Sequence, residues 1–388
     1  MEFAGIITEY DPFHNGHAAQ LAAVRRAGAR RIAVCLSSGA VQRGGAPILP
    51  ESVRVRAALA AGADLVVALP APYACATAEQ FAAAGVALLA ALGCDTLAFG
   101  AETPHAAQLL HAAGVLQSEA LQPLVRQNLA AGMTYAAARA AAAETLEPGL
   151  GALLRTPNNI LGIEYCKAIR AQNAPLTPLA LPRWGAAHGG APGWHAGTAM
   201  ASASYLRAQP VEAWAPYVPP AAQALYTKAR ADGLLLSPAR LETALLALLR
   251  ARPAADFAAV RGVSEGLEHR LAAAVRDATG LEDLYTRLKT KRYPHARLRR
   301  LVWDAALGTP PDLPAPPFLL VLGGRKEALP CLKQAALPVG TSLADLMRTG
   351  GAAQRVGALH SRAVDLSALC RKKILPMGLA FTAKPVVV

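Results

Sequence analysis

Two histidines separated by two residues, in the run His14–Asn15–Gly16–His17, carry the sharpest chemical signal in this 388-residue chain. The run follows a short apolar segment and opens a helical pattern. A helix N-terminus offers unpaired amides and the positive end of a dipole, which suit a phosphate. Two imidazoles one turn apart can donate to phosphate oxygens as charge builds up there, and Gly16 leaves room for a close approach. The run therefore predicts a nucleotide-phosphate site, with a capped helix start bearing two surface histidines as the alternative.

A second possible phosphate cradle lies further along, at Ser202, Ser204 and Arg207. Two hydroxyls and a guanidinium near a helix N-terminus can all donate hydrogen bonds to an anion. Serine and arginine are also common on solvated helix faces, so this pattern alone favours a surface. It gains weight only because the histidine pair stands in the same chain.

A third segment combines positive charge with aromatic rings. Its basic residues are Lys289, Lys291, Arg292, Arg297, Arg299 and Arg300, and the aromatic residues among them are Tyr285, Tyr293 and Trp303. Ring stacking together with arginine–phosphate contacts is how many proteins hold unstacked RNA. A charge run is more often a solvated helix face, so the residues alone leave both interpretations open.

The composition of the whole chain narrows the classes of protein. There are 39 Lys and Arg against 26 Asp and Glu, a formal net charge of +13. This balance suggests a polyanionic partner, most often nucleic acid, unless the arginine content only follows genome base composition. No apolar run of 18 or more residues lacks a charge or a breaker, so we expect no transmembrane helix. The start of the chain lacks the basic segment of a signal peptide, and we expect a cytoplasmic location.

Cysteine usage gives no sign of a metal centre. The six cysteines are scattered, with no C-x-x-C pair, and most lie in apolar runs where cysteine acts as a small buried hydrophobe. We therefore predict no protein-bound structural metal.

The elements that must position these residues alternate regularly over the first hundred residues. We predict strands at 3–8, 31–36, 65–69 and 96–99, and helices at 18–27, 52–61 and 79–92. Strands separated by helices imply parallel βαβ units with helices on both faces of the sheet. Ligands of such sheets bind at the carboxyl ends of the strands, which is where His14 and Gly100 would lie.

The rest of the chain is mostly helical in pattern. We predict helices over 105–147 with a break at 132–133, a helix at 159–170, a strand at 176–181, a glycine-rich loop at 188–197 and a helix at 199–207. A proline-rich run at 210–220 marks a domain boundary. The predicted fold class is α/β: a Rossmann-like parallel-sheet domain, residues 1–209, followed by a mostly helical, basic domain with a small mixed tail, residues 210–388.

The first two motifs together resemble the HIGH-motif nucleotidyltransferases, such as the nicotinamide-mononucleotide and phosphopantetheine adenylyltransferases. In that superfamily an H-x-G-H run near the first strand is joined by a later S-S-T-x-I-R run. Ser202, Ser204 and Arg207 match the later run in spacing, with Ala203 in place of its middle serine.

A closer resemblance, to the bacterial tRNA(Met) cytidine acetate ligases, extends over nearly the whole chain. Residues 9–17, EYDPFHNGH, are similar to the E-Y-N-P-F-H-N-G-H signature of that family. Further matching blocks follow in the same order at residues 38–39, 41–44, 62–66, 99–100 with 102, 157–165, 289–293 and 297. Four positions depart from the family pattern: Asp11 replaces an asparagine, Ala101 a serine and Ala68 a glutamate near the ATP site, while Leu320 replaces an arginine in the tail, whose role stays open.

This resemblance implies an ATP-dependent acetylation of the exocyclic amine of the wobble cytidine in elongator tRNA(Met). Acetate and ATP would first form acetyl-adenylate, with His14 and His17 as the catalytic residues. The implied ATP-binding residues are Ile7, Thr8, Glu9, Tyr10, Asp11, Pro12, Phe13, His14, Asn15, Gly16, His17, Ala18, Ala19, Gln20, Gly100, Asn158, Asn159, Arg183, Ser202, Ser204 and Arg207. The implied tRNA contacts are Lys289, Lys291, Arg292, Arg297 and Arg300. Mg²⁺ is expected on the phosphates, with no carboxylate marked as its ligand, and the oligomeric state is left open.

Several alternatives remain at the level of the residues. Asn158 and Asn159 follow a proline at a helix start, where an asparagine can cap the helix or contact a nucleotide. Arg183 can pair with phosphate or with a surface acid. The chain could also be a small-molecule adenylyltransferase, which would not need the basic segment, or a non-catalytic RNA-binding protein, against which the intact histidines argue.

Overall fold

The computed structural model describes all residues except 184–189, 265 and 291–292. Its centre is a twisted sheet in which the first five strands run parallel in the order β3-β2-β1-β4-β5. Their bounds are β1 Phe3–Thr8, β2 Arg31–Ser37, β3 Leu65–Leu69, β4 Thr96–Ala101 and β5 Thr177–Pro182. The predicted α/β sheet is thus confirmed, and β1 lies at its centre with neighbours on both sides.

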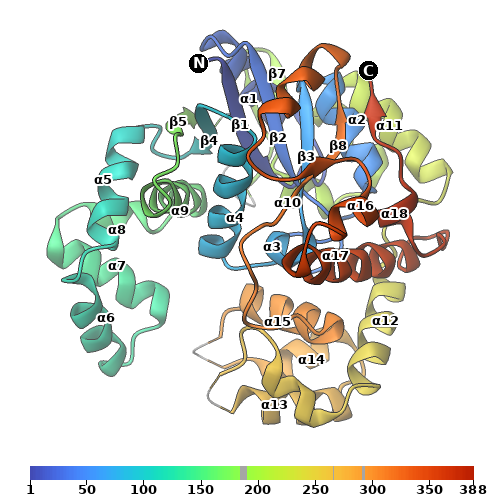
Figure 1. Ribbon diagram of the computed structural model, residues 1–388. Helices are drawn as coiled ribbons and strands as arrows, with labels where there is room; N and C mark the ends of the chain where they lie inside the picture. The colour runs from blue at the N-terminus through green and yellow to red at the C-terminus, as the bar shows by residue number, and fades with distance from the viewer. Residues whose placement is uncertain (184–189, 265, 291–292) are drawn as a thin grey trace.

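Alternate residues of β1 face two different cores, as the period of two in a strand requires. Phe3 and Ile7 belong to the hydrophobic cluster under α4 (Ala78–Ala91) and α9 (Pro157–Ala171). Ala4 and Ile6 belong to the opposite cluster. That second cluster is covered by α1 (Asn15–Arg26), α2 (Glu51–Ala60) and α11 (Pro220–Ala231) (Figure 1).

Two helical groups flank the sheet. On the left of Figure 1 lie α5 Ala106–Leu116, α6 Leu121–Ala130, α7 Tyr135–Leu146 and α8 Leu150–Leu153. Below the sheet lie α12 Pro238–Arg250, α13 Leu267–Asp277, α14 Leu281–Leu288 and α15 His295–Leu307, which share a third hydrophobic cluster. The helix α17 (Gly351–Leu369) packs between this group and the short α3 (Ala71–Ala74).

The C-terminal tail returns to the sheet. Strand β8 (Leu319–Gly324) pairs antiparallel with β3, and β10 (Val386–Val387) and β9 (Val339–Gly340) pair with β8. The short helices α16 (Leu343–Met347) and α18 (Leu379–Thr382) complete this region. The domain division at residue 210 stays a prediction, although the sheet draws strands from both sides of it.

One predicted helix is shorter than the sequence pattern suggested. The expected helix at 199–207 begins only at Ala203, as α10 (Ala203–Arg207), because Thr198–Met200 forms strand β7 against β6 (Gly193–His195). The Ser202 hydroxyl accepts a hydrogen bond from the amide of Tyr205 and so caps the helix at this point. Of the predicted glycine-rich loop at 188–197, residues 188–189 lie outside the described residues, and its last part forms strand β6 and the turn of this hairpin.

Across the described part of the chain, every helix is too short or too polar to span a bilayer.

Candidate active site

The histidine run forms the turn between β1 and α1. His14 is the N-cap residue, and its Nδ1 accepts a hydrogen bond from the amide of Gly16 at 3.1 Å. The amide of His14 in turn donates to Nδ1 of His17 at 3.3 Å. The two rings stack with centroids 3.7 Å apart and an interplanar angle of 23°. Each histidine thus uses Nδ1 to build the turn itself, in a reciprocal capping arrangement.

Both imidazoles are neutral at physiological pH. Burial lowers the pKa of His14 to about 3, with the positive charges of Arg183 and Arg207 adding to the effect. Burial also lowers the pKa of His17 well below its usual value, assisted by His14 and the same two arginines. A neutral imidazole whose Nδ1 accepts a hydrogen bond carries its proton on Nε2. Both Nε2–H groups are therefore free of the turn and can donate to a ligand.

Two arginines bring positive charge beside this pair. Arg207, at the end of α10, donates from Nη1 to the carbonyl of Asp11 at 2.7 Å. Burial lowers its pKa to about 10, which still leaves it charged at neutral pH. Arg183 directly follows β5 and pairs loosely with Glu102 at 3.4 Å. The hydroxyls of Ser202 and Ser204 lie 3.0 Å apart on the same wall.

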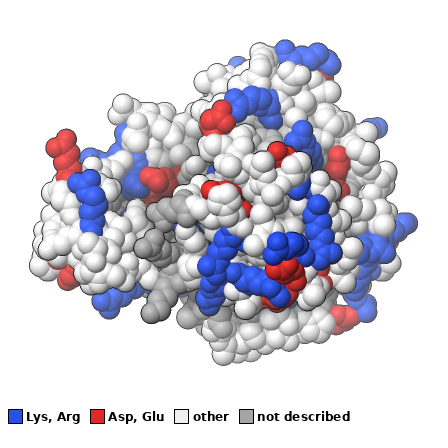
Figure 2. All heavy atoms as spheres, turned by 90° about the horizontal axis from the view of Figure 1, so that it is seen from below, with Lys and Arg blue, Asp and Glu red and all other residues white. Residues whose placement is uncertain are grey.

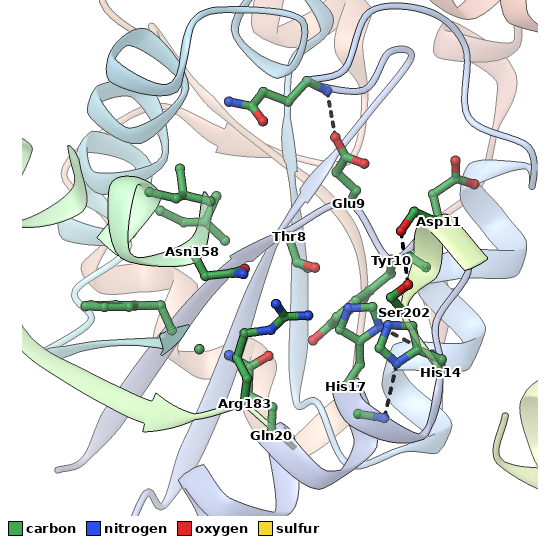
Figure 3. A pocket seen from close by; sticks show the side chains of 18 of the residues that line it. Thr8, Glu9, Tyr10, Asp11, His14, His17, Gln20, Asn158, Arg183 and Ser202 are labelled. Atoms are coloured by element: carbon green, nitrogen blue, oxygen red, sulfur yellow. Dashed lines mark hydrogen bonds between the residues drawn. The ribbon is translucent and has the colours of Figure 1, made fainter. Parts of the chain in front are cut away.

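The opposite end of the site is built on the start of α9. Glu102 accepts from the side chain of Asn158 at 2.6 Å and from the amide of Asn159 at 2.8 Å. Burial acts to raise the pKa of Glu102, but these hydrogen bonds outweigh it and hold the pKa below its usual value. Asn159 is buried and bonds to Thr103, so only Asn158 faces the open space (Figure 3).

These groups surround one cavity of about 300 Å³ at the carboxyl ends of β1 and β4. In Figure 3, Asn158 lies across the cavity from His14 and His17, with Arg183 between them. The predicted ATP residues that line it are Ile7, Thr8, Glu9, Tyr10, Asp11, His14, Gly16, His17, Gln20, Gly100, Asn158, Arg183, Ser202, Ser204 and Arg207. The fold thus brings together predicted residues that are up to 200 positions apart in the chain.

Six predicted ATP residues are not among those lining the cavity: Pro12, Phe13, Asn15, Ala18, Ala19 and Asn159. Asn15 has a structural role instead, because its side chain donates to the carbonyls of Ala199 and Pro216 at 2.9 and 3.1 Å. The buried ring of Phe13 packs edge-on against Tyr10. Asn15 and Phe13 thus stabilise the histidine turn through contacts outside the cavity lining.

Sequence reasoning missed seven lining residues: Gln42, Phe81, Phe99, Leu161, Tyr165, Pro182 and Ala203. The rings of Phe99 and Tyr165 lie 5.5 Å apart and, with Leu161, form an apolar wall on the side of Asn158. Their types and spacing match ordinary core residues, so chemistry alone did not mark them as ligand contacts. Gln42, Phe99, Leu161 and Tyr165 had a signal all the same, since each stands in one of the blocks that resemble the acetate ligases.

An ion-pair network supports the rim of the cavity. Arg43 donates to Glu9 at 2.8 Å and pairs with the buried carboxylate of Asp11. The amide of Gln42 donates to Glu9 at 2.7 Å. Burial acts to raise the pKa of Asp11, but the positive charges of Arg43, Arg54 and Arg207 outweigh it and keep the pKa low. Asp11, which departs from the family asparagine, therefore serves as a charged anchor for Arg43.

Comparison with known proteins gives a consistent answer. A family model described as HIGH nucleotidyl transferase matches residues 1–373. The tRNA(Met) cytidine acetate ligase of Syntrophotalea carbinolica is 35% identical, over 90% of this chain and 88% of that protein. The enzyme of the same name from Levilactobacillus brevis is 35% identical, over 93% of this chain and 94% of that protein. The chain belongs to the tRNA(Met) cytidine acetate ligase family.

Solved structures confirm the fold of this acetate ligase family member. Crystalline TmcAL of Thermotoga maritima without ligand superposes with a TM-score of 0.91, covering 100% of both chains at 22% identity. The same protein bound with alpha-thio ATP gives a TM-score of 0.89, over 100% of this chain and 99% of that one, at 22% identity.

The carboxylates beside the cavity do not form a ready metal site in this member of the family. In the described part of the chain, no three His, Cys, Asp or Glu side chains cluster as metal ligands would. Glu9 and Asp11 are paired with Arg43, and Glu102 is occupied by Asn158, Asn159 and Arg183. A metal ion arriving here would depend on ligand oxygens for most of its contacts.

The basic segment, from Lys289 to Arg300, contains the start of α15. Lys289 is exposed and Arg297, Arg299 and Arg300 are half-buried, while Lys291 and Arg292 lie outside the described residues. Figure 2 shows that Lys and Arg outnumber Asp and Glu on the face seen from below. Arg300 donates to the carbonyl of Gln42 at 3.3 Å, so the segment reaches the rim of the cavity.

The aromatic residues of this segment do not have the expected arrangement. Tyr285, Tyr293 and Trp303 are 7%, 9% and 1% exposed and belong to the hydrophobic cluster of α12–α15. Arg297 covers the ring of Tyr293 at 4.6 Å from its centroid. The expectation that these rings stack on RNA bases is therefore wrong for the described structure, because their faces are used in the core.

Proposed function

We propose that this chain is an ATP-dependent ligase that acetylates the exocyclic amine of the wobble cytidine in elongator tRNA(Met). The observation that carries the proposal is the pair of neutral imidazoles at a helix N-terminus, with Arg183 and Arg207 beside them. Relatives that share about a third of the sequence over almost the full length carry the corresponding name.

In the first step an acetate oxygen attacks the α-phosphorus of ATP, and the bond to the bridging oxygen breaks as pyrophosphate leaves with its electron pair. His14 and His17 donate from Nε2 to phosphate oxygens on which charge develops. Because both donors are neutral and fixed by the turn, they need no reorganisation during the reaction. Arg183, Arg207, Ser202 and Ser204 hold the departing pyrophosphate.

In the second step the cytidine N4 amine attacks the carbonyl carbon of acetyl-adenylate, and AMP leaves with the electrons of the mixed-anhydride bond. The amine proton passes to solvent or to the departing phosphate. The wobble base is unpaired in the free anticodon, so no duplex must open before the amine reaches the cavity.

The apolar wall at Phe99, Leu161 and Tyr165 suits the adenine ring, and Asn158 can hydrogen-bond to the nucleoside beside it. We assign the nucleotide contact to Asn158 and a structural role to Asn159, because only Asn158 lines the cavity. Mg²⁺ would accompany the phosphates as their counter-ion, and no step here depends on a protein ligand to it.

We assign tRNA binding to the basic segment, Lys289, Lys291, Arg292, Arg297 and Arg300. Support comes from its charge and from the Arg300 contact with Gln42, which brings the segment to the cavity rim. The location that follows from a tRNA substrate is the cytoplasm.

The proposal is tested by exchange of labelled pyrophosphate into ATP without tRNA. Exchange should require acetate, because only the carboxylate can form the adenylate whose reversal regenerates ATP. Adding tRNA should then release AMP and pyrophosphate in equal amounts. Release of ADP, or transfer of AMP to a stable small-molecule product, would refute the proposal and favour a small-molecule adenylyltransferase.

A further inference from the structure

Gln42 brings a side-chain amide without a partner to the wall of the ATP cavity. Across the residues that the structure describes, its backbone amide and carbonyl are hydrogen-bonded, but its Oε1 and Nε2 are not. The residue is half-buried, so a ligand in the cavity can reach this amide. Asn158, another amide of the cavity, is instead bonded to Glu102. A donor and an acceptor are therefore free at Gln42.

The backbone that carries this amide is held on both sides. The backbone amide of Gln42 donates to the carboxylate of Glu9 at 2.7 Å, and its carbonyl accepts from Arg300 at 3.3 Å. The next residue, Arg43, is anchored on Glu9 and Asp11. A side chain on a fixed backbone loses less conformational freedom when it binds a ligand. Gln42 is thus a preorganised contact.

Gln42 also connects the cavity to the basic segment. Among the described residues that line the cavity, Gln42 alone is hydrogen-bonded to that segment, through Arg300. In Figure 3, Glu9, which holds the backbone of Gln42, lies at one end of the cavity, whereas Arg183 and Gln20 lie at the other. A tRNA held by the basic segment therefore reaches the cavity at Gln42, away from Arg183.

Cytosine offers a matching pair of groups. Its Watson–Crick edge presents N3 as an acceptor and the N4 amine as a donor, and an amide carries one donor and one acceptor side by side. We propose that Gln42 holds the target cytosine, with Nε2–H on N3 and Oε1 on one N4 hydrogen; this inference rests on the proposed function. Both hydrogen bonds lie in the plane of the base. The lone pair of N4 is perpendicular to that plane, so the amine stays open to the acetyl carbonyl.

The first test compares the two half-reactions in Gln42→Leu, which keeps the size of the side chain and removes the amide. Acetyl transfer to unmodified tRNA(Met) should fall by about 10–100-fold, the usual cost of a lost bidentate base contact. Acetate-dependent pyrophosphate exchange without tRNA should fall far less, because no cytosine takes part in it. Adenine presents the same order of donor and acceptor at N6 and N1, so ATP is the competing partner. Exchange that falls as much as transfer would assign the amide to ATP or acetate and overturn the proposal.

The second test removes the partner atom from the RNA. A tRNA(Met) with 3-deazacytidine at the wobble position keeps the amine but has C–H in place of N3. The slowing of transfer caused by this replacement should be about fivefold smaller in Gln42→Leu than in wild type, because the hydrogen bond to N3 is already absent there. Gln20→Leu, at the other end of the same cavity, is the matched control and should keep the wild-type slowing. Slowing that agrees within about twofold between wild type and Gln42→Leu would exclude the contact.

Failure of this inference and failure of the proposed function give different results. Wild-type protein that neither exchanges pyrophosphate nor acetylates tRNA would refute the function itself. Wild-type protein that does both, with Gln42→Leu transferring acetyl groups at the wild-type rate, would refute only the cytosine contact.

Discussion

At the scale of single residues, each of the two histidines uses one ring nitrogen for the turn and leaves the other for a ligand. Nδ1 of His14 and His17 accepts a backbone hydrogen bond within the turn, which leaves Nε2–H directed to a ligand. Burial and two nearby arginines keep both rings uncharged. The positive charge of the site thus comes from Arg183 and Arg207. The imidazoles contribute neutral hydrogen-bond donors whose positions are fixed by the turn.

Two substitutions at His17 separate the nitrogens. Asn can offer an acceptor near the place of Nδ1 but no donor at Nε2, whereas Gln can offer an amide donor near Nε2. We expect His17→Asn to lower acetate-dependent pyrophosphate exchange by about 10²–10³ with a nearly unchanged melting temperature, which is the usual cost of one lost transition-state donor. His17→Gln should retain more of the rate. The same substitution at His269, an exposed histidine on α13, serves as the control and should leave the exchange rate unchanged. Full exchange activity in folded His17→Asn would remove the catalytic assignment.

The low histidine pKa values predict how exchange depends on pH. Because the pKa of His14 is about 3 in the folded protein, lowering the pH from 7.5 to 5.5 should not inactivate the enzyme by protonating this ring. A pH–rate profile of pyrophosphate exchange measures this. An inflection near the ordinary histidine pKa of about 6.5 that disappears in His14→Asn would show that the ring titrates normally.

The same shift predicts a loss of stability in acid. In the unfolded chain His14 binds a proton below pH of about 6.5, while the folded protein binds it only near pH 3. The contribution to stability is therefore present above pH 6.5 and is lost as the pH falls below that value, by at most about 1.4 kcal/mol per pH unit. Urea unfolding at pH 7 and pH 5 should show a smaller difference in His14→Asn than in wild type. An equal difference in both proteins would contradict the shift.

At the scale of elements, a short loop connects the ATP cavity with the basic segment. Residues 41–45 follow β2, and the Arg43 side chain is anchored on Glu9 and Asp11. On the other side, the backbone of α15 at Arg299 comes so close that a Cβ at Gly44 would lie 2.6 Å from it. The loop thus fits closely between β1 and α15.

Gly44→Ala tests this close approach. We expect it to lower the free energy of unfolding by about 1–3 kcal/mol, because the methyl group would overlap the α15 backbone and the φ of +90° is strained for alanine. Gly45→Ala is the matched control in the same loop, since its φ is +125° but nothing lies within 4 Å of the added atom. Urea unfolding should give the larger loss at Gly44. Equal losses would mean that backbone strain alone matters and that the loop does not press on α15.

The elements also show where prediction from sequence ends. The strands of the βαβ units were predicted within about two residues, because an apolar period and nearby breakers are local signals. The pairing of β8 with β3 joins segments about 250 residues apart, and nothing local marks it. Arg54 and Arg43 belong to ordinary surface-like sequence, and only the fold shows that they are buried or half-buried among carbonyls and carboxylates.

At the scale of the whole molecule, the question is which part of the surface uses the net charge of +13 to bind tRNA. We expect replacement of Lys289, Lys291 and Arg292 by alanine to weaken tRNA binding and to reduce the slope of log affinity against log salt by roughly 0.7–0.9 for each lost phosphate contact. Acetate-dependent pyrophosphate exchange should survive, because none of the three was assigned to the ATP site.

The control variant removes the same charge elsewhere, at the exposed Lys326, Lys333 and Lys384. It should keep the salt slope of wild type. If both triple variants bind tRNA alike, overall charge and not the basic segment holds the RNA. If exchange also collapses in the first variant, the segment helps to form the ATP cavity.

The central claim is that acetate activated in the ATP cavity is transferred to a cytidine amine, and one measurement tests it most directly. The protein is incubated with ATP, carbon-labelled acetate and unmodified tRNA(Met), and the digested nucleosides are separated. The label should appear in N4-acetylcytidine, with one AMP released for each acetyl group, and a tRNA(Met) whose wobble base is uridine should remain unlabelled because it has no exocyclic amine. Label in the uridine tRNA, or no label in RNA while AMP is still released, would contradict the account.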